Sequence, residues 1–291
     1  MSQIKRTESK NSMGSDKIRL DDLLVKRGLF ENKSQAQAAI MAGGVKINGK
    51  TSLKAGTRFA DREELEIETK NLPFVSRGGF KLEKAAREFQ IELKGRICLD
   101  CGASTGGFTD YLLQNGAEKV YAIDVGYGQL AWKLRNDPRV ITLERINIRY
   151  ATIEEIYKDL KVKDPQLFAD IAVIDLSFIS LEKVLANIIK LMKLENIEII
   201  ALIKPQFEAG KEEVPKSGVI KDKKIHFKVI KNVVKYACEL GLYPKKLTYS
   251  PIKGPAGNIE YLIHLTDRHS KLEDEAITEV VEEANGKLSS G

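Results

Sequence analysis

ICLDCGASTGGFTDYLLQNG, residues 97–116, decides the fold class of this chain. An apolar strand runs directly into a glycine-rich turn, and the turn runs into a helix. Open α/β sheets bind their ligands at the carboxyl ends of strands, beside a turn of this kind. Gly102, Gly106 and Gly107 follow a G-x-x-x-G-G spacing rather than the G-x-G-x-x-G of dinucleotide sites, and the sequence contains no G-x-x-x-x-G-K-[ST] phosphate loop. The turn therefore predicts a cofactor without a pyrophosphate.

Short β-rich runs alternate with helical stretches on the C-terminal side of this turn. A long helix is expected from about Lys224 to Leu240. This order implies an α/β fold with a Rossmann-like, doubly wound sheet, mostly parallel, with an antiparallel last strand in a hairpin-like final pair. The expected strands are residues 96–100, 119–125, 140–144, 170–175, 197–203, 247–250 and 258–265.

Two acidic residues at strand ends indicate what the cofactor is. A carboxylate at Asp100, just before the turn, would repel a pyrophosphate but suits the cationic amino-acid end of S-adenosylmethionine. Asp124 ends the next strand and is placed like the acid that binds ribose hydroxyls in Rossmann-type sites. Each signal alone could be a helix cap or a plain turn. The predicted cofactor-binding residues are Asp100, Gly102, Ala103, Ser104, Thr105, Gly106, Gly107, Asp124 and Asn147.

The residues that follow the second and third strands give weaker signals for the cofactor site. Asn147 and Arg149 follow the third strand, where a role at the cofactor adenine or the RNA is as compatible with the sequence as loop packing. Tyr127 and Gln129 lie just past the second strand and are candidates for the adenosine pocket. Trp132 is expected in the core, as lone aromatic residues on helices usually are.

Basic residues are concentrated near the N-terminus. The chain has a formal net charge of +6, and residues 1–58 contain twelve Lys and Arg against five Asp and Glu. This suits binding to phosphate backbones, although a solvated basic face is the alternative. Residues 18–24 carry an apolar helical stripe, a second helix starts near Ser34, and Asn48-Gly49 is a hairpin signal. We expect a compact α+β module of about 50 residues.

This module resembles the ribosomal-protein S-four-like RNA-binding domain. The resemblance is carried by RLDDLLVKRGLFENKSQAQAAIMAGGVKINGK, residues 19–50. In that family two short helices and the following loop form the RNA face, so the resemblance implies a set of phosphate contacts, although some of them could be merely solvated. The candidates are Arg19, Lys26, Arg27, Lys33 and Lys46.

The domain organisation follows from these patterns, with Pro73 and Gly78-Gly79 interpreted as breaks in structure. The acidic C-terminal residues have helical apolar spacing and are expected to form a surface helix or tail. The expected divisions are a disordered lead at 1–15, a small basic RNA-binding domain at 16–69, a linker at 70–80, a methyltransferase domain at 81–267 and the acidic tail at 268–291.

Several classes of function are disfavoured by composition. Three cysteines do not make a disulfide framework, and Cys98 and Cys101, despite a zinc-like spacing, should point to opposite faces of a strand. We expect no metal site. There is no apolar run near the roughly 18 residues that span a bilayer, and the N-terminus lacks an apolar signal core. The sequence predicts a cytoplasmic protein without a membrane partner.

Four polar residues stand at element ends of an otherwise apolar sheet: Lys81, Asp175, Lys204 and Glu260. They resemble the Lys-Asp-Lys-Glu tetrad of the FtsJ-like ribose methyltransferases. SRGGFKL, DCGASTGGFTD, DLSFISL, KPQFEAG and GPAGNIEY are closer still to the TlyA (hemolysin A) family of rRNA 2′-O-methyltransferases, from about residue 18 to residue 265. The resemblance implies S-adenosylmethionine as cofactor, ribosomal RNA or ribosomal subunits as partner, and a cytidine ribose as target.

The tetrad also makes chemical sense. A ribose hydroxyl is a poor nucleophile, so the protein must place it in line with an activated methyl group and help to remove its proton. A lysine acts as a base where desolvation and a nearby cation favour its neutral form. The resemblance makes Lys204 the base and Lys81 the neighbouring cation and phosphate ligand, with Asp175 and Glu260 orienting both. An ordinary surface ion pair is the alternative for Lys81 and Glu260.

Three other functions compete with this interpretation. A cytolysin is suggested only by the historical name of the resembling family, and the lack of an apolar span opposes it. A non-catalytic RNA-binding or assembly factor would have a degenerate site, whereas the tetrad and glycine loop are intact. A base methyltransferase should carry an Asn/Asp-Pro-Pro-aromatic loop after the fourth strand, where this chain reads DLSF.

Overall fold

The computed structural model describes residues 17–288, apart from residues 31, 42, 53, 61–65 and 70–72. The chain divides into two compact units, Met1–Leu72 and Pro73–Gly291. The lead expected at 1–15 lies outside the described residues, as does the first part of the linker expected at 70–80. Helix α3 (Gly78–Phe89) begins inside that linker, three residues before the expected second domain.

The glycine pair that suggested a break is instead the first turn of α3. A Cβ atom at Gly79 would lie 2.3 Å from the ring of Phe74, and one at Gly107 would lie 2.8 Å from the backbone nitrogen of Gly79. These glycines therefore allow α3 to approach α4 (Gly107–Gln114) closely. Interpreting them as a break was wrong because glycine also serves close packing inside helices.

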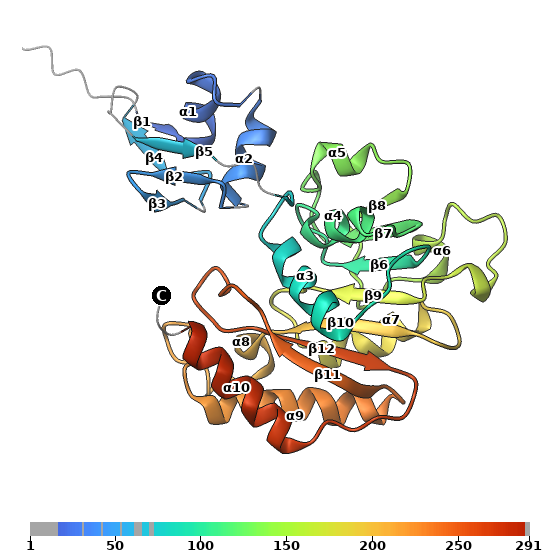
Figure 1. Ribbon diagram of the computed structural model, residues 1–291. Helices are drawn as coiled ribbons and strands as arrows, with labels where there is room; N and C mark the ends of the chain where they lie inside the picture. Colours follow the sequence, from blue (N-terminus) through green and yellow to red (C-terminus); the bar gives the residue numbers. More distant parts are fainter. Residues whose placement is uncertain are drawn as a thin grey trace, which may run out of the picture. The chain divides into compact units, whose positions relative to one another are not determined.

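The N-terminal unit is a small α+β module (Figure 1). β1 pairs with β4, and β2 lies between β3 and β5, all antiparallel. Asn48 and Gly49 both have positive φ, so they form the tight turn of the predicted hairpin. Its elements are β1 (Lys17–Arg19), α1 (Leu20–Lys26), α2 (Lys33–Met41), β2 (Val45–Ile47), β3 (Lys50–Thr51), β4 (Arg58–Ala60) and β5 (Ile67–Thr69).

The C-terminal unit is built on a seven-stranded sheet in the order β11-β12-β10-β9-β6-β7-β8. Besides α3 and α4, its helices are α5 (Trp132–Arg135), α6 (Ile153–Ile156), η1 (Pro165–Leu167), η2 (Leu181–Lys183), α7 (Leu185–Lys190), α8 (Pro205–Glu208), α9 (Lys223–Glu239) and α10 (Asp274–Leu288). Its strands are β6 (Ile97–Cys101), β7 (Lys119–Asp124), β8 (Val140–Glu144), β9 (Ile171–Ile174), β10 (Glu198–Ile203), β11 (Tyr243–Tyr249) and β12 (Tyr261–Thr266).

The pairing of the strands confirms the predicted fold class. β8, β7, β6, β9 and β10 are parallel neighbours, whereas β12 runs antiparallel between β10 and β11. The chain moves from β6 outward to β7 and β8, then returns to β9 on the other side of β6. In open α/β sheets, ligands bind at the carboxyl ends of the strands where the order reverses in this way, here β6 and β9.

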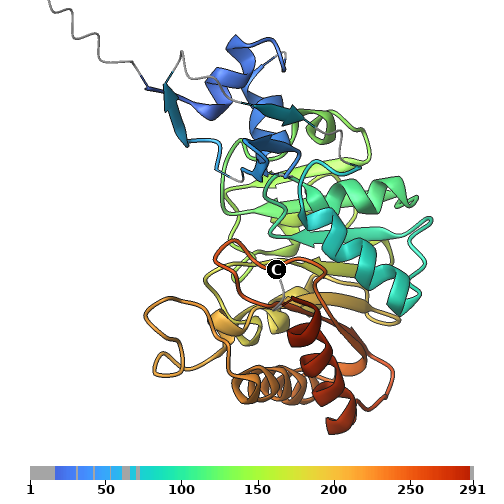
Figure 2. The ribbon, with the colours of Figure 1, turned by 60° about the vertical axis from the view of Figure 1, so that its left-hand side comes forward.

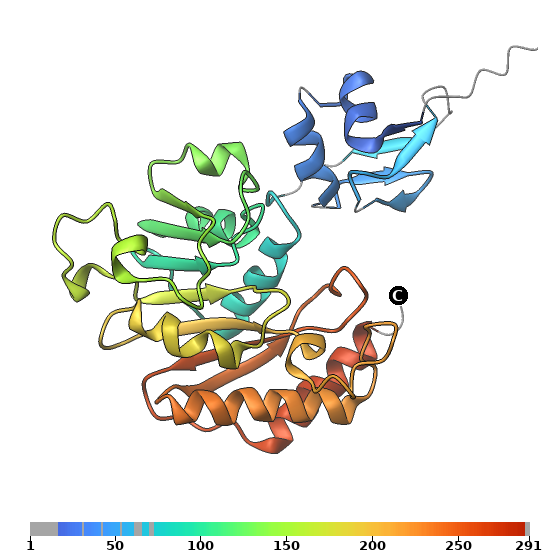
Figure 3. The same ribbon diagram turned by 180° about the vertical axis from the view of Figure 1, so that it is seen from behind.

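Helices cover both faces of the sheet. The core on one face includes Leu82 of α3 and Leu112 of α4 (Figure 2). The opposite core includes Leu185 of α7 and Val229 of α9, on the side seen in Figure 3. The segment expected as an acidic tail or surface helix forms α10, whose buried Ile277 belongs to this second core.

The two cysteines of β6 separate as predicted. Cys98 belongs to one core and Cys101 to the other, and both side chains are fully buried. Burial raises the pKa of each thiol far above its ordinary value. Each therefore behaves as a small apolar core residue.

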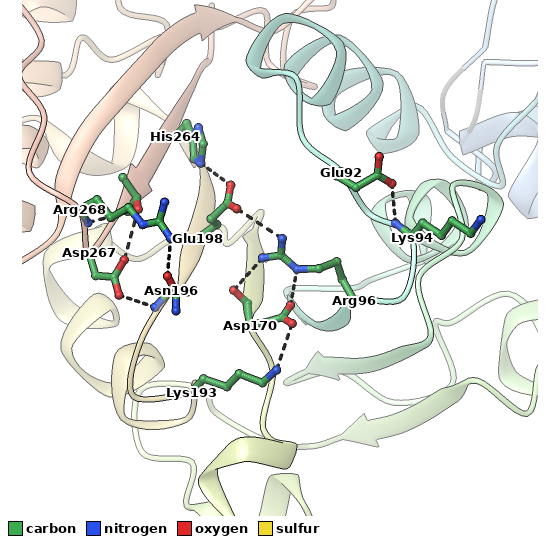
Figure 4. Close-up of polar contacts among 11 residues, drawn as sticks. Glu92, Lys94, Arg96, Asp170, Lys193, Asn196, Glu198, His264, Asp267 and Arg268 are labelled. Atoms are coloured by element: carbon green, nitrogen blue, oxygen red, sulfur yellow. Dashed lines mark hydrogen bonds and ion pairs between the residues drawn. The ribbon is translucent and has the colours of Figure 1, made fainter.

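A network of charged side chains lies at the amino edge of the parallel strands (Figure 4). Nε of Arg96 lies 2.6 Å from Asp170, just before β9, and its Nη1 lies 3.4 Å from Glu198 at the start of β10. Glu198 also lies 2.8 Å from Nε2 of buried His264 in β12. The network thus connects residues in or next to four strands, β6, β9, β10 and β12.

This network should make the free energy of unfolding depend on pH in the acid range. The hydrogen bond with His264, together with Arg96 and against the effect of burial, lowers the pKa of Glu198 to about 2 from an ordinary value near 4.5. A depressed carboxyl pKa gives stability that is present above pH ~4.5 and lost as pH falls toward ~2. We expect Glu198→Gln to cost about 1–3 kcal/mol at pH 7. In urea unfolding, the difference in free energy of unfolding between wild type and Glu198→Gln should narrow between pH ~4.5 and ~3. A constant difference would contradict a contribution from ionised Glu198.

Candidate active site

The four tetrad residues lie on elements that meet at the carboxyl edge of the parallel strands. Asp175 directly follows β9, and Lys204 directly follows β10. Glu260 directly precedes β12, whose antiparallel direction brings its start to the same edge. Lys81 lies in the first turn of α3. The sheet topology thus gathers residues that are up to 179 positions apart in sequence.

The tetrad forms one continuous chain of alternating charges. Nζ of Lys204 lies 2.6 Å from Asp175, which lies 3.5 Å from Nζ of Lys81, which in turn lies 2.7 Å from Glu260. Glu260 is 1% exposed, and both lysines are 7% exposed. The alternative of an ordinary surface ion pair is therefore wrong, and these contacts form a buried, electrically balanced cluster.

Mutual attraction keeps the centre of this cluster ionised. Burial acts to lower the pKa of Lys81, but the carboxylates of Asp175 and Glu260 outweigh it and raise that pKa. Burial likewise opposes ionisation of Asp175, yet Lys81 and Lys204 lower its pKa below the ordinary value. The two carboxylates therefore favour the charged form of Lys81.

Two glycines allow the backbone to approach Asp175 and Glu260 closely. Gly102 has a φ of +93°, and a Cβ atom there would lie 2.5 Å from the carbonyl oxygen of Asp175. A Cβ atom at Gly254 would lie 2.5 Å from Oε1 of Glu260. The glycine turn after β6 can thus reach the strand end that carries Asp175, which brings the predicted cofactor loop beside the tetrad.

Asp100 provides the clearest fit for a cationic ligand. It is fully buried, and its Oδ2 accepts a hydrogen bond of 2.6 Å from Oγ1 of Thr109 in the first turn of α4. Its Oδ1 is buried and has no hydrogen-bond partner among the described residues. Burial raises the pKa of Asp100 to about 7. An unsatisfied buried acceptor of this kind fits the ammonium group of S-adenosylmethionine.

Asp124 shapes the loop next to Asp100. Its two oxygens accept hydrogen bonds from the backbone N–H groups of Ser104, at 2.8 Å, and Gly126, at 2.7 Å. Ser104 adopts a left-handed φ of +48° and also hydrogen-bonds Gln129 through its hydroxyl. A carboxylate has about four acceptor positions, so Asp124 can still accept from ribose hydroxyls. The loop residues between Gly102 and Gly107 fit the predicted adenosine site.

The outer residues of the site differ in part from expectation. Asn147 is exposed, and its Oδ1 accepts from the N–H of Arg149, which supports loop packing and leaves its predicted cofactor role a proposal. Trp132 is 73% exposed, so its expected place in the core was wrong. α5 is only four residues long, and its core side is taken by Leu134, which packs against Gly106. Tyr127 is also exposed and stacks under Arg145.

Three residues at the site were missed from the sequence. Ser177 hydroxyl lies 2.9 Å from Nζ of Lys204. Arg77, the residue before α3, is half-buried beside Glu260, and burial lowers its pKa. Phe178 is 89% exposed with a left-handed φ of +65°. The signal available in the sequence was their position, two to four residues from Lys81 or Asp175.

The candidate RNA contacts of the N-terminal unit are partly engaged within the module. Arg19 makes two hydrogen bonds, of 2.9 and 2.8 Å, to buried Asp21, and Lys33 lies 2.7 Å from Asp22. Although burial opposes it, Arg19 and Gln37 lower the pKa of Asp21 to about 2. Arg19 is thus also a structural residue. Exposed Lys26 and Arg27 and half-buried Lys46 complete the predicted set.

Two properties of the described residues bear on the other function classes. Within the ranges given above, there is no cluster of three or more His, Cys, Asp or Glu side chains arranged to hold a metal ion. No helix among the described residues combines the length and apolar character needed to cross a membrane.

Comparisons with known proteins agree with this site. An FtsJ-like methyltransferase model matches residues 74–267, and an S4 domain model matches residues 18–62. The "Putative rRNA methyltransferase YqxC" of Bacillus subtilis is 45% identical over 95% of this chain and 97% of its own. The 16S/23S rRNA (cytidine-2'-O)-methyltransferase TlyA of Mycobacterium tuberculosis is 44% identical over 87% of this chain and 92% of its own. A solved structure, a "Putative hemolysin" from Streptococcus thermophilus, is 42% identical, covers 95% of this chain and 98% of its own, and has a TM-score of 0.73.

The matches contain both domains in the order that the sequence implied. The methyltransferase match alone spans more than half of the chain and includes the tetrad and the glycine loop. The chain therefore belongs to the S-adenosylmethionine-dependent FtsJ-like methyltransferases, within the TlyA (hemolysin A) family that carries an N-terminal S4 domain.

Proposed function

We propose that this protein transfers a methyl group from S-adenosylmethionine to the 2′-hydroxyl of a cytidine ribose in ribosomal RNA. The observation that carries the proposal is the buried chain of charges Lys204–Asp175–Lys81–Glu260 beside the unsatisfied carboxylate of Asp100. The activity of the Mycobacterium tuberculosis relative supports the choice of cytidine. We infer that the protein acts in the cytoplasm, where its ribosomal substrate is made.

The residues around the glycine turn would hold the cofactor. Asp100 would bind its ammonium group through Oδ1, and Asp124 its ribose hydroxyls. When bound, S-adenosylmethionine supplies a methyl group already activated by the sulfonium charge. The close contact between Gly102 and Asp175 would keep that methyl group beside the tetrad.

Within the tetrad each residue has a separate task. Lys204, as the neutral amine, would take the proton of the 2′-hydroxyl, and Ser177 and Asp175 hold its Nζ in place. Lys81, kept positive by two carboxylates, would attract the negative charge that develops on the ribose oxygen. Glu260 touches Lys81 and fixes its direction.

Arg77 would bind a phosphate next to the target nucleotide. It is half-buried near Glu260, and among the described residues none makes a hydrogen bond or ion pair with its guanidinium. We expect Arg77→Ala to raise KM for RNA about 10-fold and to reduce the salt dependence of RNA binding by about one charge, with cofactor affinity unchanged. Filter binding at several salt concentrations measures this. Arg87→Ala, an exposed arginine on the same helix, is the matched control, and an equal effect there would contradict a specific contact.

The proposal is tested by methyl transfer to defined RNA. Tritiated S-adenosylmethionine is incubated with the protein and with unmodified 16S and 23S rRNA, naked or in assembled subunits. We expect label in at least one rRNA and none in a non-ribosomal RNA. Cofactor binding without label in any rRNA would move the assignment to another RNA or to a non-catalytic assembly factor.

A further inference from the structure

Glu208, four residues after Lys204, occupies a place that local structure does not favour. It is the last residue of α8, a four-residue helix, where a carboxylate faces the negative end of the helix dipole. The side chain is half-buried, and burial raises the pKa of Glu208. A contact elsewhere in the fold must therefore offset the cost of this position.

That contact joins the segment after β10 to the segment after β9. Oε2 of Glu208 accepts a hydrogen bond of 2.7 Å from the hydroxyl of Ser180, and Oε1 accepts one of 2.9 Å from the N–H of Leu181. Both donors lie at the start of η2. The carboxylate thus caps η2 from a segment 27 residues away in sequence.

The same two segments carry two of the contacts on which methyl transfer would depend. Asp175 and Ser177, on the segment after β9, hold Nζ of Lys204, on the segment after β10. Between these contacts and the Glu208 cap, the rings of Phe178 and Phe207 pack with centroids 5.0 Å apart. Phe178 has a left-handed φ of +65°, a conformation that a phenylalanine keeps only when its surroundings hold it.

We propose that Glu208 is a positioning residue that locks the β9–η2 segment to α8 and so keeps Asp175 and Ser177 in place against Lys204. The inference rests on the proposed function of the tetrad and adds a residue that touches neither substrate nor cofactor. α8 connects Glu208 to Lys204 rigidly: it begins at Pro205, and the N–H of Phe207 donates a hydrogen bond of 2.9 Å to the carbonyl of Lys204. Base and hydroxyl must be aligned closely, since a misplacement of about 1 Å can cost about 100-fold in rate.

Glu208→Gln tests the lock because glutamine keeps the shape but has only one oxygen for two donors. We expect kcat to fall about 10-fold, with KM for RNA and affinity for S-adenosylmethionine changed less than about 2-fold. Ser180→Ala should lower kcat in the same way, and the double variant should be no worse than the poorer single one. Glu182→Gln, an exposed neighbour in η2, is the matched control and should keep wild-type kcat.

Two further measurements separate positioning from general stability. Hydrogen exchange at the N–H of Leu181 should become faster in Glu208→Gln, while exchange in β6 stays unchanged. The wild-type fall in kcat toward acid pH, to which protonation of Glu208 contributes, should become shallower in Glu208→Gln. Wild-type kcat with unchanged exchange would overturn the proposal, and so would a loss of kcat that only follows a fall in Tm. If wild type itself methylates no rRNA, the proposed function fails, whereas exchange at Leu181 still decides whether the lock exists.

Discussion

Replacing Lys204 with alanine is expected to lower kcat by about 10²–10⁴-fold, because general-base catalysis contributes on that scale. Nζ of Lys204 is held by Asp175 and Ser177 at the edge of the sheet and has no part in the predicted cofactor site. The affinity for S-adenosylmethionine should therefore stay within about 2-fold of wild type. Single-turnover methyl transfer and calorimetric cofactor binding measure the two quantities separately.

A charge-preserving variant distinguishes a base from a mere cation. Lys204→Arg keeps a positive charge, but a guanidinium does not lose its proton in proteins. We expect it to be as inactive as Lys204→Ala. Lys161→Ala, an exposed lysine in the loop before η1, is the control and should keep wild-type activity. Substantial activity of Lys204→Arg would contradict the role of Lys204 as the base.

Replacing Asp100 with asparagine is expected to weaken binding of S-adenosylmethionine about 10–100-fold, since a buried charge-assisted hydrogen bond contributes on that scale. The free energy of unfolding of the cofactor-free protein should not fall with this change. The raised pKa of Asp100, about 7, means that the cofactor-free protein loses stability as pH rises from ~4 to ~7, and asparagine removes that loss. Calorimetry and thermal unfolding at pH 7 measure both effects.

The pH dependence of cofactor binding tests the ionisation of the same carboxyl group. A cationic ligand binds the ionised form of Asp100, so the affinity of wild type should rise up to about 10-fold per pH unit below pH ~7 and then level off. The cofactor's own ammonium group begins to lose its proton near pH ~8. Asp100→Asn should lack the rise, whereas Asp137→Asn, which changes a carboxylate at another site, should keep it. A flat wild-type profile from pH 5 to 7 would place the ammonium elsewhere.

Local patterns predicted the fold class, and together with the family resemblance they named four residues that the structure brings into contact. The strand–turn–helix at Ile97–Gln114 predicted a parallel sheet with a ligand at its carboxyl edge, and the final hairpin-like pair appears as β11 and β12. Asp175, Lys204 and Glu260 each end or interrupt an apolar run, and the resemblance to the FtsJ-like family joined them with Lys81 into a tetrad. Which strand β12 would pair with is a tertiary property, so the strand order is known only from the structure.

Residues that act through distant contacts could not be predicted in the same way. Glu208 and Ser180 look like ordinary loop residues in sequence, and only the fold brings the carboxylate of one to the hydroxyl of the other. Trp132 was placed wrongly because a helix of four residues buries only one side, and Leu134 occupies it. Gly79 was interpreted as a break because glycine gives the same signal for a turn and for close helix packing.

The most direct test of ribose methylation is the chemical position of the transferred methyl group. Ribosomal RNA labelled by the protein is hydrolysed in alkali, which needs a 2′-hydroxyl at each cleaved bond, and the resistant fragments are identified by mass spectrometry. We predict that the label remains in a dinucleotide whose first residue is cytidine, and that this fragment is absent with Lys204→Ala although cofactor binding is retained. Label recovered in mononucleotides, on a base, would contradict ribose methylation by the tetrad.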